Sequence, residues 1–188
     1  MNALANPKVG EYLNEHCIST YQKVGTFTVA ATGQKQGGNV ATYFCLGDGS
    51  VLHAVAGPVD AQTLLREARW VIDTRKLAAF ESRGDAAKYR AFFRKAHHER
   101  LMMEYGIDKR TQINANETLV SQQLLYSHQQ TVRNLLMRGH GWNKSPDNQA
   151  KVHMLLIDFP MAKVQDVYRP VFENILNERV STLPVALR

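Results

Sequence analysis

The chain has few cysteines and no long apolar run, and these two absences exclude several classes of protein. Only Cys17 and Cys45 are present among 188 residues, too few for the disulfide framework of a secreted domain. No run of about 18 apolar residues occurs, so we expect no membrane span. The N-terminus also lacks the basic start and apolar stretch of a signal peptide. These features predict a reduced protein of the cytoplasm.

The short motifs of common enzyme classes are also missing. There is no Gly-x-Ser-x-Gly elbow, no Walker loop and no dinucleotide-binding glycine pattern. Thiol redox enzymes of the Cys-x-x-Cys type are excluded in the same way, because that motif does not occur. We therefore expect no cofactor and, more generally, a non-enzymatic role.

What is present is an ordinary globular composition with a basic surplus. The chain is 44% hydrophobic and 21% charged, with a net charge of +6. The surplus lies in residues 61–110, and its densest part interleaves Lys88, Arg90, Arg94 and Lys95 with aromatic residues. This pattern suits an anionic partner such as nucleic acid, but helical spacing turns the aromatics inward. We interpret the four cations mainly as a solvated face and expect weak nucleic-acid binding at most.

A hairpin followed by a helix is the clearest local pattern. Two apolar runs, 40–46 and 51–56, are joined through Asp48-Gly49, which is a strong signal for an antiparallel turn. Asp60 then provides the N-cap of a helix. The apolar positions of that helix fall on one face: Leu64, Leu65, Ala68, Val71 and Ile72.

The order strand, tight turn, strand, Gly57-x-x-Asp60, helix resembles the closing half of a thioredoxin-like domain. In that family the first of these strands begins with a cis-proline beside a Cys-x-x-Cys motif. Ala41 stands at the proline position here, so the resemblance implies a unit without redox activity. The resemblance covers about residues 7–80, and we predict a thioredoxin-like unit over 1–80.

The N-terminal segment fits the same resemblance. Asn6 and Pro7 are suited to the cap and first turn of a helix that extends to Ile18. This helix resembles the one that follows the active-site motif in the family, and residues 19–24 resemble the strand after it. We expect this strand to pair with residues 40–46 or with a strand from another chain.

Residues 81–188 predict a helical extension, so the overall fold class is α/β with a partial thioredoxin-like sheet. Ser82 to Asp85 has the form of a capping box that opens a helix ending at Gly106. A second helix is expected to begin near Asn114, and a linker over 138–148 precedes an apolar segment over 152–159.

The last helix has the cleanest apolar period in the chain, and Pro170 within it predicts a break near Tyr168. Its stripe offers an apolar surface that a short sheet may be too small to cover. The residues proposed as a partner surface are Val167, Val171, Phe172 and Ile175. We therefore expect a protein partner or self-association.

Seven histidines raise the question of a metal site. The densest group is His97 and His98, but neighbours on a helix point about 100° apart, whereas helical metal motifs place histidines four residues apart. His128 and His153 lie beside apolar stripes and are interpreted as half-buried core residues, while His140 lies in a glycine-rich loop. Because no ligand spacing is present, we expect no metal.

The sequence thus supports three functional hypotheses. The first is a non-enzymatic binding or assembly protein on a redox-inactive thioredoxin-like unit. The second is a thiol-dependent redox protein that uses Cys17 or Cys45, although both positions are typical of buried core cysteines. The third is a basic protein associated with nucleic acid.

Overall fold

The computed structural model describes residues 3–22, 28–29, 31, 35–36, 39–109 and 147–180. The elements follow in the order η1 (Ala3–Ala5), α1 (Pro7–His16), β1 (Thr28–Val29), β2 (Lys35–Gln36), β3 (Ala41–Cys45), β4 (Val51–Ala56), α2 (Ala61–Ser82), α3 (Ala86–Tyr105), α5 (Asn148–Asp158), α6 (Val164–Pro170) and the π-helical η2 (Val171–Ile175). The predicted second helix after Asn114, with His128 and His140, lies outside the described residues.

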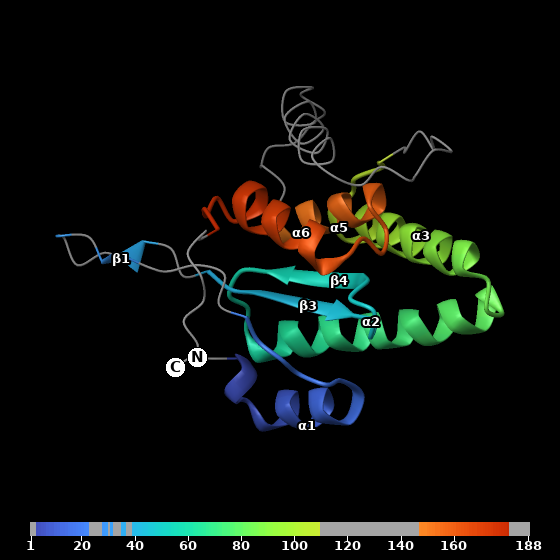
Figure 1. Ribbon diagram of the computed structural model, residues 1–188, viewed down its shortest axis with the longest axis horizontal. Helices are drawn as coiled ribbons and strands as arrows, with labels where there is room; N and C mark the ends of the chain where they lie inside the picture. The colour runs from blue at the N-terminus through green and yellow to red at the C-terminus, as the bar shows by residue number, and fades with distance from the viewer. Residues whose placement is uncertain are drawn as a thin grey trace.

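The fold is a mixed α/β arrangement built around the β3–β4 hairpin (Figure 1). Helix α2 lies along one side of the hairpin, with α1 beyond it, and α5 and α6 lie on the other side (Figure 1). Helix α3 returns from the end of α2 and packs against both α2 and α5. None of the described helices is long and apolar enough to cross a membrane.

The hairpin forms where the sequence predicts it. Strands β3 and β4 are antiparallel, and Phe44 pairs with His53 in the register. The carboxylate of Asp48 accepts a hydrogen bond from the backbone N–H of Ser50 at 3.0 Å, while Gly49 takes a φ of 81° that other residues rarely adopt. All six residues of β4 are buried, which fits its continuous apolar run rather than an alternating one.

The helix caps confirm most of the predicted boundaries. Asn6 and Asp60 accept hydrogen bonds from the first backbone N–H groups of α1 and α2. The prediction at α3 was wrong in one detail, since its N-cap is Asp85 alone. Ser82 is instead the last residue of α2, and its hydroxyl donates to a carbonyl within that helix. Gly106 ends α3 in the left-handed conformation, as predicted.

Two apolar cores flank the hairpin. The first joins the hairpin to α1 and α2, and its residues include Val9, Leu13, Phe44, Leu52, Val55, Leu64, Ala68, Val71 and Ile72. The second joins β4 to α5, α6 and η2, and its residues include Val51, Ala54, Ala56, Val152, Leu155, Leu156, Val167, Val171 and Ile175. The hairpin is therefore covered by helices of its own chain on both sides.

This second core overturns the predicted partner surface. Val167, Val171, Phe172 and Ile175 are each 5% exposed or less, so they are not available to another chain. The prediction underestimated how closely α6 and η2 pack on β4 and α5. The break in the last helix occurs at Pro170, where the α-helix passes into the π-helical turn, because proline lacks the N–H that would continue the α-helical ladder.

The strand predicted over residues 19–24 is also not formed as expected. Residues 19–22 have no regular structure, and the short strand β1 begins at Thr28. It pairs with β2 in a separate two-stranded hairpin and not with β3. The peptide bond before Ala41 is trans, as are all those in the described residues.

Beyond Val51, whose N–H donates to the carbonyl of Ala162, carbonyls on the outer edge of β4 are capped by side chains. The carbonyl oxygen of Leu52 accepts a hydrogen bond from Nε2 of His97 at 2.9 Å. The carbonyl oxygen of Ala54 accepts one from the amide of Gln149 at 2.8 Å. Because buried backbone carbonyls need partners, these two side chains from α3 and α5 do what a third strand would do.

Candidate metal centre

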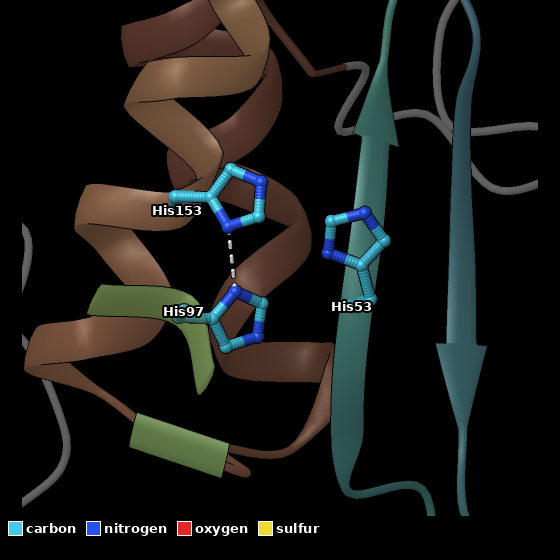
Figure 2. A group of neighbouring side chains, drawn as sticks. All are labelled: His53, His97 and His153. Carbon is cyan, nitrogen blue, oxygen red and sulfur yellow. Dashed lines mark hydrogen bonds between the residues drawn. The ribbon is translucent and has the colours of Figure 1, made fainter. Parts of the chain in front are cut away.

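Three histidines from three separate elements meet in the interior. His53 lies on β4, His97 on α3 and His153 on α5, and the three rings face one another (Figure 2). Their exposed fractions are 0%, 1% and 0%. One ring nitrogen of each lies within 4.8 Å of the corresponding nitrogens of the other two. Among the described residues this is the one such group of potential metal ligands.

The hydrogen bonds fix the tautomers of His97 and His153. Nε2 of His97 must carry a proton, because its partner, the carbonyl of Leu52, can only accept. Burial lowers the pKa of His97 to about 3, so the ring is neutral and its Nδ1 is an acceptor. That nitrogen lies 2.8 Å from Nδ1 of His153, which therefore donates (Figure 2). Nε2 of His153 is left as a buried lone pair that has no hydrogen-bond partner in the described part of the chain.

His53 is oriented by a buried carboxylate. Its Nε2 lies 3.0 Å from Oε2 of Glu67, a residue that is only 1% exposed. Burial raises the pKa of Glu67, but hydrogen bonds from His53 and Arg100 outweigh it and hold the pKa below the usual range. The carboxylate is therefore ionised and accepts the proton of His53 Nε2, a nitrogen that also lies 3.2 Å from the amide of Gln149. With that proton on Nε2, Nδ1 of His53 is a second buried lone pair that has no partner among the described residues.

An aromatic and charged shell encloses the three rings. The indole of Trp70 meets them nearly edge-on, with ring-centroid distances of 4.9 Å to His53, 5.1 Å to His97 and 5.7 Å to His153. The guanidinium of Arg100 lies 4.7 Å from the centre of the same indole and donates to Glu67 at 2.7 Å. Trp70 thus contacts both the three rings and Arg100, while Glu67 joins Arg100 directly to His53.

This arrangement has the donor set of a transition-metal centre. Metal-bound histidines usually donate their second N–H to a carboxylate or a backbone carbonyl, which fixes the ring and increases its basicity. His53 does so to Glu67 and His97 does so to Leu52. An ion with bonds of about 2.0–2.1 Å to nitrogen holds two tetrahedral ligands about 3.3 Å apart. The ring nitrogens lie within 4.8 Å of one another, so the rings would have to move closer to reach that spacing.

Sequence reasoning did not predict this candidate centre, since it expected no metal. It placed His153 in the core, although as half-buried rather than fully buried. His98 points away from the cluster, toward Asp108 at 3.1 Å. His53 was not singled out. It stands 44 residues before His97, which in turn stands 56 before His153, so no local spacing rule connects them. The available signal was one histidine inside an otherwise apolar strand.

The predicted thiol candidates lie away from the histidine cluster. Cys17 is half-buried at the end of α1, whereas Cys45 is exposed, so the expectation of two buried cysteines was wrong for Cys45. It falls at the irregular end of the hairpin, where the register shifts. Burial raises the pKa of both thiols, and nearby Asp48 adds to the effect at Cys45. Neither residue therefore has the depressed pKa of a nucleophilic cysteine.

The predicted basic surface is only partly free. Lys88 and Arg90 are exposed on α3. Arg94 is turned toward α5, where its Nε donates to the carbonyl of Ile157 at 3.1 Å. Lys95 forms an ion pair with Glu99 one turn along the same helix, at 3.6 Å. This leaves a smaller cationic face than the sequence suggested.

Comparison of the chain with protein-family models, with curated proteins and with solved structures gives no match.

Proposed function

We propose that this protein binds one divalent transition-metal ion through His53, His97 and His153. The observation that carries the proposal is the pair of buried lone pairs at Nδ1 of His53 and Nε2 of His153, for which the described residues offer no hydrogen-bond partner. A buried polar atom without a partner costs about 1–3 kcal/mol. A bound ion would use the lone pair of His53 and take the place of the proton between Nδ1 of His97 and Nδ1 of His153. That proton would move to Nε2 of His153 and occupy the second lone pair.

The donor chemistry favours zinc or a close analogue. Imidazole suits Zn²⁺, Cu²⁺, Ni²⁺ and Fe²⁺, whereas Mg²⁺ and Ca²⁺ require oxygen ligands. The cluster offers nitrogen donors only. Glu67 provides a buried negative charge beside His53, and this charge would offset part of the charge of a divalent ion.

The direct test is the titration of metal-free protein with Co²⁺ and Zn²⁺. We expect one equivalent to bind, with visible d–d bands for cobalt, and we expect zinc to displace the cobalt. In a Trp142→Phe variant Trp70 is the single remaining indole. Because it lies about 5 Å from the rings, Cu²⁺ should quench its fluorescence with the same stoichiometry.

Matched variants make the test specific. His97→Ala removes a ligand, whereas His98→Ala removes the neighbouring histidine of the same helix, which lies outside the cluster. We expect stoichiometric binding to be lost in the first and kept in the second. Equal binding by both variants, or no binding by the parent protein, would refute the proposal.

Metal binding is compatible with the non-enzymatic binding or assembly role expected from the sequence, and with a redox-inactive thioredoxin-like unit over residues 1–80. The covered stripe of the last helix no longer supports assembly. A partner would instead meet apolar side chains that are exposed on α2, namely Leu77 and Phe80. Light scattering across a concentration series tests self-association, since a constant mass of 21.2 kDa would contradict it.

A further inference from the structure

Two features of the histidine cluster point to different roles for a bound ion. Three protein ligands leave one tetrahedral position, which in catalytic zinc sites holds water or substrate. Structural zinc sites are closed. Here all three ligands are at most 1% exposed, and Trp70 lies against each of the three rings. This burial indicates that a substrate could not reach the fourth coordination position of a bound ion.

The cluster also coincides with the weakest part of the sheet. An isolated two-stranded hairpin is marginally stable in water. At the start of β4 the outer edge has a backbone partner, since the N–H of Val51 donates to the carbonyl of Ala162 at 2.9 Å. Further along, the carbonyls of Leu52 and Ala54 are capped by side chains, and the cap on Leu52 is Nε2 of His97. The other cap, Gln149, lies on α5 one turn before His153. Two of the three residues that would hold the ion therefore belong to the helices that cap this edge, and the third lies on β4 itself.

We propose, on the basis of the metal function above, that the ion is a structural cross-link that holds α3 and α5 against the open edge of β4 in place of a third strand. Its three ligands lie on segments far apart in the chain, so one ion closes two long loops. Closing long loops restricts the unfolded chain most strongly. Burial of the three ligands would close the fourth coordination position to a substrate.

Hydrogen exchange on the full-length chain, with and without Zn²⁺, tests the cross-link. If opening of the β4 edge releases the ion, free zinc at about 100 times its Kd should slow exchange of the segments that cover residues 51–56 and 148–158 by about 100-fold. The N-terminal helix α1, whose main contacts are with α2 and η1, should respond only as far as global unfolding contributes.

Gln149→Leu is the matched variant for the edge. It removes the cap on Ala54, together with the 3.2 Å contact between the Gln149 amide and His53 Nε2, and keeps all three histidines. We expect faster exchange of residues 51–56 in the metal-free variant, and restored protection when zinc is added. Azide or thiocyanate added to the cobalt protein should leave its visible spectrum unchanged, because the ion is closed off.

The outcomes separate this inference from the proposed function. Zinc that binds with full stoichiometry but leaves exchange at β4 and α5 unchanged would overturn the cross-link and leave metal binding intact. A spectral shift with azide would overturn the closed site in the same way. Failure to bind any ion would remove both.

Discussion

Replacing Glu67 by Gln tests how the centre is built, because Glu67 orients a ligand without being one. Its Oε2 accepts the hydrogen bond from His53 Nε2, and its Oε1 accepts one from Arg100 at 2.7 Å. Gln keeps the size of the side chain and an acceptor oxygen but removes the negative charge. Loss of such a partner typically lowers metal affinity about 10- to 100-fold, which corresponds to about 1.4–2.7 kcal/mol.

The same substitution should also destabilise the metal-free protein. Removing one partner of a buried ion pair costs about 3–5 kcal/mol. Arg100 would keep its 2.8 Å bond to Glu104 and its place over Trp70, so we expect the lower end of that range. Urea unfolding of the metal-free variant measures this term, and competition with a chromophoric chelator measures metal affinity separately.

Glu104→Gln is the control for this experiment. It removes the other carboxylate of Arg100, which is more exposed, and does not touch His53. We expect a smaller loss of stability and a metal affinity within about threefold of the parent. If Glu67→Gln also binds zinc as tightly as the parent, the carboxylate does not support the ligand and the reasoning fails.

Three further predictions follow from other parts of the structure. A thiol reagent should label exposed Cys45 faster than half-buried Cys17 in the native protein, with no effect on metal binding, and labelling in the reverse order by mass spectrometry would contradict the placement. Lys163 and Ser50 hold the pKa of Asp48 at about 2, against about 3.9 in an unfolded chain. Because the pKa of Asp48 is depressed on folding, the stabilisation that its charged form provides is complete above about pH 5 and is lost as the pH falls through 2. Urea should therefore unfold Asp48→Asn at a lower concentration than the parent near pH 7, and at the same concentration near pH 2. Arg90→Glu should reduce any nucleic-acid binding measured at low salt, and binding that persists at physiological salt would contradict the solvated-face interpretation.

Local patterns in the sequence predicted the local structure well, since the hairpin and the helix starts depend on neighbours. The Asp48-Gly49 turn and the caps Asn6 and Asp60 each act over two or three residues. The same reasoning failed where packing decides. The apolar periodicity of the last helix fits a stripe that binds a partner as well as one that is buried in the core. Only the position of β4 and α5 in the structure shows that residues such as Val171 are buried.

The metal centre was beyond local reasoning for a different reason. Ligand-spacing rules describe sites in which one helix or loop supplies several ligands. Here each of three elements supplies one, and the carboxylate behind His53 comes from a fourth, α2. Glu67 carried a signal that was not used: it lies on the buried side of α2, one residue before Ala68, at a position where an unpaired carboxylate would be costly.

The polar groups of the interior are linked by hydrogen bonds. Each of these buried polar groups would be unfavourable in isolation. They are a histidine in a fully buried strand, a carboxylate on a buried helix face, and two helix side chains directed at the edge of β4. Together they form two hydrogen-bonded chains, one from Arg100 through Glu67 to His53 and one from Leu52 through His97 to His153. Among the described residues, Nδ1 of His53, Nε2 of His153 and Nη1 of Arg100 in these chains have no hydrogen-bond partner. A fully apolar core could have filled the same space without this cost. The proposed metal ion, bound by the three rings, would give the two histidine nitrogens a role that the protein groups alone do not.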